Sequence, residues 1–129
     1  MPATTFPEYA REITETLEQA VTTGDAVLLT LQVDQRSAIR GFIAGSVQFA
    51  DGSTLHCREF VDMSQAEPKI MYAYHYQDAD RRLIFRYDNA AHRPTLPHPA
   101  HKHTASGVEV SPVPTLFEIL DYILRQTHP

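Results

Sequence analysis

The stretch IMYAYHYQDADRRLIFRYD, residues 70–88, decides the fold. Two runs rich in aromatic and branched residues, 70–77 and 82–88, flank the polar tetrapeptide 78–81. Alternating apolar runs on either side of a short polar turn are typical of an antiparallel β-hairpin. This is the clearest hairpin in the sequence.

The hairpin predicts a sheet with two chemically different faces, because successive side chains of a strand point to opposite sides. An aromatic face is expected to be core, and the opposite face carries ionisable groups. A turn centred between residues 79 and 80 predicts His75 opposite Ile84 and Ala73 opposite Arg86. The aromatic face holds Tyr72, Tyr74, Tyr76, Leu83, Phe85 and Tyr87. The mixed face holds Met71, Ala73, His75, Ile84, Arg86 and Asp88.

Elements on either side complete the fold. Apolar residues recur every four positions over 9–21, which predicts a helix ending at Gly24, and a second apolar face over 116–124 predicts a helix beginning at Thr115. Three more strands are predicted at 26–33, 38–49 and 54–62, with Gly41 and Gly45 marking bends or bulges. Residues 89–107 hold three prolines and no periodic pattern, and are predicted to form a long loop.

The predicted fold class is therefore α+β: a central antiparallel sheet of about five strands, flanked by N-terminal and C-terminal helices, in a single domain over residues 1–129. The lone cysteine, Cys57, cannot form an internal disulfide, and no apolar run approaches the roughly 20 residues of a membrane span. Both features lead us to expect a cytoplasmic protein without a membrane partner.

Charge is unevenly distributed along the chain. The net charge is −5, yet residues 81–103 hold five basic residues, one acidic residue and four of the seven histidines. Such a segment either attracts a phosphate-bearing ligand or is a solvated loop without a role. Charge alone favours the solvated loop.

The segment RYDNAAHRPTLPHPAHKH, residues 86–103, holds the candidate chemistry. Imidazoles titrate near neutral pH and can share proton abstraction and donation, while a neighbouring cation stabilises charge on a phosphate. These groups suffice for RNA cleavage without a metal or another cofactor. The expected catalytic residues are His92, His101 and His103 for proton transfer, Arg86 and Lys102 for phosphate, and Asp88 to orient a histidine.

Secondary candidates are Glu59, His75, Tyr74, Asn89 and His98. Glu59 shares a strand face with apolar residues, so it either points inward and pairs with Arg86 or is an edge-strand charge that discourages aggregation. The tyrosines of the hairpin either stack bases or are core, and core is the better interpretation.

Two other functions stay open. His101 and His103, with Asp88, His92 and His98, could form a mixed nitrogen and oxygen metal site of a hydrolase or nuclease, although Lys102 between them disfavours a cation. Alternatively, the chain is a non-enzymatic interaction module that binds a partner protein or nucleic acid, with both strands of the hairpin offering edges for pairing.

Residues 38–125 resemble the TumE-like family of toxin–antitoxin toxins. The resemblance rests on Glu59-Phe60-Val61, then MYAYHYQDADRRLIFRYDNAAH (71–92) and PAHKH (99–103) before an apolar terminal helix. This chain has Ala100-His101 where a histidine pair is expected. Matching positions are Glu59, Tyr74, His75, Arg86, Asp88, Asn89, His92, His101, Lys102 and His103. The resemblance implies a toxin restrained by a cognate antitoxin encoded alongside.

The leading hypothesis is thus a toxin that cleaves RNA, with an antitoxin and an RNA substrate as partners and a homodimer left open. Arg86 and Asp88 are expected in an open cleft, where the Arg86 guanidinium is free to bind a phosphate. In that case Arg86→Ala abolishes activity and leaves thermal stability almost unchanged.

Overall fold

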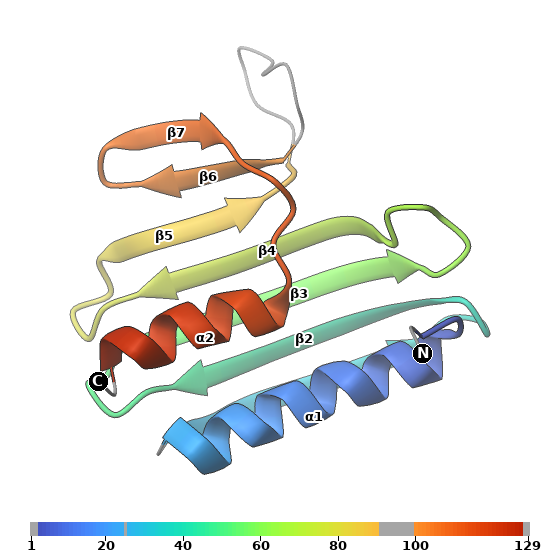
Figure 1. Ribbon diagram of the computed structural model, residues 1–129, viewed down its shortest axis with the longest axis horizontal. Coiled ribbons are helices and arrows are strands. Elements are labelled where there is room, and N and C mark those ends of the chain that lie inside the picture. Colours follow the sequence, from blue (N-terminus) through green and yellow to red (C-terminus); the bar gives the residue numbers. More distant parts are fainter. Residues whose placement is uncertain (1–2, 25, 91–99, 128–129) are drawn as a thin grey trace.

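A computed structural model describes residues 3–24, 26–90 and 100–127 of the chain (Figure 1). It contains one seven-stranded antiparallel sheet in which each strand pairs with the next along the chain. The helices are α1 (Phe6–Gly24) and α2 (Leu116–Thr127). The strands are β1 (Val27–Gln35), β2 (Arg40–Gln48), β3 (Thr54–Asp62), β4 (Lys69–Gln77), β5 (Leu83–Asp88), β6 (His101–Thr104) and β7 (Gly107–Val110).

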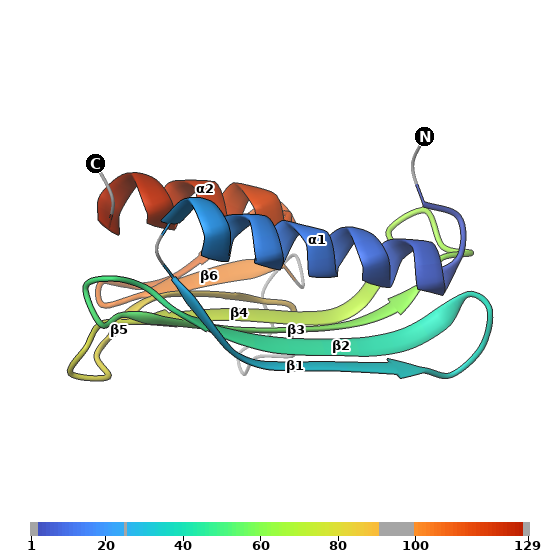
Figure 2. The same cartoon turned by 90° about the horizontal axis from the view of Figure 1, so that it is seen from below.

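Both helices lie side by side on the same face of the sheet, and within the described residues no helix covers the other face (Figure 2). The apolar stripe of α1, which includes the buried Ile13 and Leu17, packs over β1 and β2. Helix α2 lies over the middle of the sheet (Figure 1). Its residues Ile119 and Ile123 are buried. The core is therefore one layer between helices and sheet, and the uncovered face, here called the open face, meets solvent.

The α+β class is confirmed, but the sheet has seven strands instead of about five. The additional hairpin, β6–β7, begins within the segment predicted as a loop over 89–107 and extends to Val110, so that part of the prediction was wrong. Gly107 adopts a positive φ of 133° in the turn, which glycine accommodates without steric cost. The three prolines all precede residue 100, so they leave this hairpin intact.

The interpretation of Gly41 and Gly45 as bends or bulges was wrong. β2 pairs with β3 in continuous register, and the irregularity between β1 and β2 lies at Leu28 and Thr30. A Cβ on Gly41 would lie 2.2 Å from the ring of Phe6. This glycine therefore provides space for α1 to approach the sheet closely.

The predicted pairing of the 70–88 hairpin was displaced by two residues. His75 pairs with Arg86 and Ala73 with Asp88, because residues 78–82 form the turn, Arg81 has a φ of 65°, and the register shifts next to Gln77. A displacement of two leaves the paired side chains from Ala73 to Tyr76 on their predicted faces. β4 and β5 are interior strands, so the free edges belong to β1 and β7 and not to this hairpin.

None of the described helices has both the length and the apolar character needed to cross a membrane. Cys57 is a buried free thiol facing the core.

Candidate functional site

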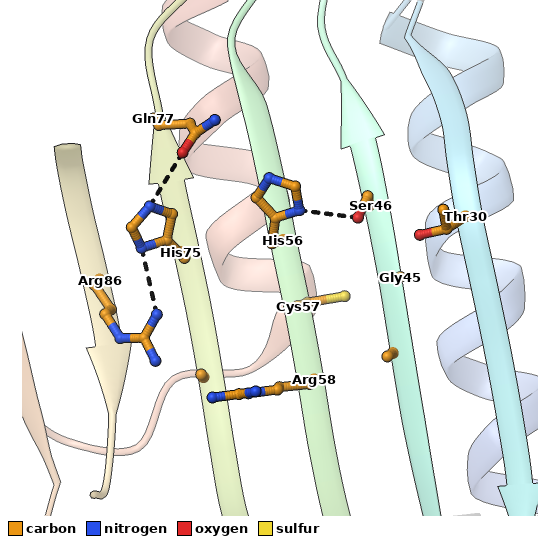
Figure 3. A pocket seen from close by; sticks show the side chains of 11 residues that line it. Thr30, Gly45, Ser46, His56, Cys57, Arg58, His75, Gln77 and Arg86 are labelled. Carbon is orange, nitrogen blue, oxygen red and sulfur yellow. Dashed lines mark hydrogen bonds between the residues drawn. The ribbon is translucent and has the colours of Figure 1, made fainter. Parts of the chain in front are cut away.

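The open face carries two adjoining hollows of about 460 Å³ each. They share Arg58 on β3, Ala73 on β4 and Arg86 on β5. Figure 3 looks onto this face with the helices behind the strands, and the Arg58 side chain extends across β4 toward Arg86. Ala73, directly opposite Arg58 in the register, contributes only a methyl group to this face between the two arginines.

Asp88 is the centre of a cluster at the edge of these hollows. Its side chain is 6% exposed, and Arg86 Nε donates a 2.7 Å hydrogen bond to Oδ2. Nε2 of His101 contacts Oδ1, and Nε2 of His103 lies 3.5 Å from Oδ2. The pairing of β5 with β6 places these groups together, because Asp88 lies opposite His101 and Arg86 opposite His103.

The environment of Asp88 favours its charged form. Burial alone would raise the pKa of this carboxyl, but the hydrogen bond from Arg86, the neighbouring His101 and the backbone N–H of Ala90 outweigh burial. The pKa of Asp88 is consequently lowered. A buried carboxylate held by several donors is well suited to fixing the orientation of imidazole and guanidinium groups.

His75 joins the cluster through Arg86. Its Nδ1 lies 3.4 Å from Nη1 of Arg86, and its Nε2 lies 3.2 Å from Oε1 of Gln77 (Figure 3). A guanidinium only donates, so Nδ1 holds a lone pair and the Nε2–H donates to Gln77. Burial and then the Arg86 charge lower the pKa of His75, which keeps the ring neutral and able to accept a proton.

The cations of the open face are incompletely neutralised. Arg86 is committed to Asp88, but Arg58 is exposed and takes part in none of the ion pairs found within the described residues. His56, also exposed, hydrogen-bonds through Nδ1 to Ser46 at 2.9 Å. This face is thus locally basic on a protein with a net charge of −5.

The predicted catalytic residues are only partly brought together. Arg86, Asp88, His101 and His103 meet on the open face, whereas Lys102 alternates to the helix face, with Nζ 5.2 Å from the centre of the Tyr87 ring. His92 and His98 lie outside the described residues.

Of three secondary candidates, Tyr74 and Asn89 lie outside the cluster and His75 lies in it. Tyr74 is fully buried on the helix face. The Asn89 amide hydrogen-bonds to the β4 backbone, accepting from Tyr72 N at 3.1 Å and donating to Ile70 O at 2.9 Å. His75 is the one that joins the cluster.

Glu59 belongs to a separate buried network. It points inward as predicted, but its expected pairing with Arg86 was wrong because the two side chains project from opposite faces. Its carboxylate accepts hydrogen bonds from Tyr9 and from Tyr74, the latter at 2.6 Å, and Lys69 Nζ donates to the Tyr74 hydroxyl at 2.7 Å. β3 is an interior strand, so Glu59 is not an edge-strand charge either.

Sequence reasoning did not select several residues that line the hollows, chiefly Arg58, His56, Phe42 and Phe60. The alternation over 54–62 does place His56, Arg58 and Phe60 on one face. Their meeting with Arg86 depends on three successive strand pairings, which no local pattern specifies.

The fold and the site define a small α+β protein whose open sheet face, within the described residues, bears a cluster of histidine, arginine and aspartate. A family model described as Toxin TumE matches residues 4–127, and the chain belongs to that family. No curated protein and no solved structure matches the chain. The family makes this a toxin-like component of a toxin–antitoxin system, which implies a cognate antitoxin.

Proposed function

We propose that this toxin is an endoribonuclease that cleaves RNA on the open face without a metal ion. One observation carries the proposal: Asp88 holds Arg86, His101 and His103 together beside a hollow that His75 and Arg58 also line. The cluster supplies proton-transfer groups and cations at one accessible place, which is what metal-free phosphodiester cleavage requires.

The reaction assigns a distinct role to each accessible group. His75 takes the proton from the ribose 2′-hydroxyl, whose oxygen attacks the adjacent phosphorus. His103 donates a proton to the departing 5′-oxygen as the P–O5′ bond breaks, leaving a 2′,3′-cyclic phosphate and a 5′-hydroxyl. Its Nε2 lies 3.5 Å from Oδ2 of Asp88, so the ring is held beside this carboxylate.

The remaining groups bind and position. Arg86 and Arg58 hold the non-bridging phosphate oxygens, for which planar guanidinium groups are suited. His101 is 1% exposed and contacts Asp88, so it acts as a positioning residue and does not touch the substrate. Lys102 has no part in this mechanism, since it lies on the helix face.

The test is cleavage of single-stranded RNA by purified protein in excess EDTA, with the product ends identified. We expect fragments ending in 2′,3′-cyclic phosphate, and a loss of at least 100-fold in rate for His103→Gln. Arg11→Gln, an exposed change on α1 across the sheet, is the matched control and retains full activity. Intact RNA at micromolar protein between pH 5 and 8 would overturn the proposal.

A second candidate is a metal-dependent nuclease, favoured by one observation. One ligand atom from each of Asp88, His101 and His103 lies within 4.8 Å of the others, and two histidines with one carboxylate form a known metal-binding set. Against this, Arg86 already occupies Oδ2 of Asp88. The same assay decides: this candidate requires EDTA to abolish cleavage, Mn²⁺ or Zn²⁺ to restore it, and elemental analysis to find bound metal.

A further inference from the structure

The second of the two hollows is lined by three apolar side chains, those of Phe42, Phe60 and Met71. Phe42 on β2 and Phe60 on β3 face each other across the strand pair, and Phe60 lies opposite Met71 on β4. Met71 is 65% exposed, and both phenylalanines are partly exposed. Contiguous apolar side chains kept at the surface are characteristic of a binding site.

This apolar hollow is continuous with the proposed cleavage site. Arg58 and Arg86 line both hollows, and Phe60 follows Arg58 by two residues on the same strand and the same face. Two such neighbours lie about 7 Å apart along a strand. An aromatic surface and a guanidinium at this spacing match the two parts of a nucleotide, its base and its phosphate.

We infer that the hollow lined by Phe42, Phe60 and Met71 is a base-binding subsite, in which an unpaired base of single-stranded RNA stacks on Phe60 while Arg58 holds the adjoining phosphate. The inference deepens the proposed function and rests on it for the reacting phosphate. Stacking requires a base that is out of a duplex, so the substrate class is single-stranded RNA.

The subsite binds a base without distinguishing one base from another. The Asn89 side chain lines the hollow, but its amide is already hydrogen-bonded to the β4 backbone. Asp88 is likewise hydrogen-bonded to Arg86, so neither side chain is available to a base. The Glu59 side chain points to the other face of the sheet. Every base has a π-face, so stacking gives affinity with little sequence preference.

A partner protein is the competing occupant, and the charges of the hollow favour nucleic acid. Two arginines border the apolar surface, one of them without an acidic partner among the described residues. Interleaved aromatic and cationic groups are the usual combination for single strands.

The experiment measures binding of a fluorescent single-stranded 2′-fluoro oligoribonucleotide, which has no 2′-hydroxyl and cannot be cleaved by the proposed reaction. We expect Phe60→Ala to weaken binding about tenfold. Phe60→Tyr retains the ring and should bind like the unaltered protein. Phe117→Ala, which removes an exposed phenylalanine from α2, is the matched control and leaves binding unchanged.

A series of oligonucleotides with one abasic position each then tests direct stacking. The unaltered protein should lose affinity at one position, and Phe60→Ala should lose nothing further there, because base and ring act as a coupled pair. Met71→Ala provides a milder variant if Phe60→Ala fails to fold. Arg58→Gln should weaken binding but keep the response to the abasic position.

The outcomes separate this inference from the proposed function. If the protein cleaves RNA and Phe60→Ala binds RNA as well as the unaltered protein does, the subsite is overturned while the ribonuclease proposal is retained. Ring-dependent binding without any cleavage of ordinary RNA supports the subsite and removes the ribonuclease. If Phe60→Ala binds RNA normally but no longer binds the antitoxin encoded alongside, the hollow is the antitoxin's binding site and the inference is overturned.

Discussion

Arg86→Ala tests whether this arginine holds a buried carboxylate. Its Nε donates to Oδ2 of Asp88 at 2.7 Å, and the two side chains are 31% and 6% exposed. A hydrogen bond to a charged group contributes about 1.5–3 kcal/mol to the free energy of unfolding. Asp88 retains its contact with His101, so we expect a loss of about 2 kcal/mol, which in a chain of this length lowers the melting temperature by about 8 °C.

The chain contains a matched control for this prediction. Arg36 and Asp34 are also two residues apart and joined through Nε and Oδ2, at 3.0 Å, but their side chains are 60% and 42% exposed. Exposed pairs of this kind contribute about 0–1 kcal/mol, so Arg36→Ala should hardly move the melting temperature.

A double-mutant cycle with Asp88→Asn completes the test, measured as melting curves of the two single variants and the pair. The two changes should be non-additive by about 1–2 kcal/mol, because each removes the same hydrogen bond. If Arg86→Ala melts no lower than Arg36→Ala, Arg86 is not anchored to Asp88. The arginine would then be wholly free to bind phosphate, as the sequence predicted.

Four further outcomes are expected. Because the pKa of Asp88 is lowered, its carboxylate stabilises the fold fully above about pH 4, the ordinary pKa of aspartate. This stabilisation is lost as the pH falls through the lowered pKa. Acid unfolding followed by circular dichroism should therefore show a smaller loss of stability for Asp88→Asn. His75 should titrate by NMR below pH 6.5, and cleavage should fall as the pH drops through its lowered pKa, because protonation removes the base; titration at or above 6.5 would contradict the assignment. Burial and the Glu59 charge raise the pKa of Cys57 to about 12, so iodoacetamide at pH 8 should label the thiol only after denaturation, as seen by mass spectrometry. Glu59→Gln should cost about 2 kcal/mol of stability through its tyrosine partners and leave RNA affinity unchanged, which melting curves and binding assays would check together.

Local pattern was sufficient to predict both helices, the first five strands and the two faces of the 70–88 hairpin. Period-two alternation over 70–88 correctly placed the tyrosines in the core and Arg86 with Asp88 on the other face, even though the predicted pairing was displaced by two residues. An even displacement preserves the faces, so the error left the chemistry of each face unchanged. The four-residue repeat over 9–21 and the cap at Thr115 likewise located both helices, because these signals involve neighbours along one turn.

Only the tertiary structure decided which polar groups meet. The pairing of β5 with β6 brings His101 and His103 to Asp88, and the same alternation sends Lys102 to the helix face, although the three residues 101–103 look equivalent in a segment read as a loop. The packing of both helices on one side leaves the other side open, and three successive strand pairings bring Arg58 beside Arg86. These contacts join residues far apart in the chain, and their geometry is fixed by strand order, register and helix placement. A sequence pattern records which face a side chain occupies on its own strand, but it does not record which neighbours share that face.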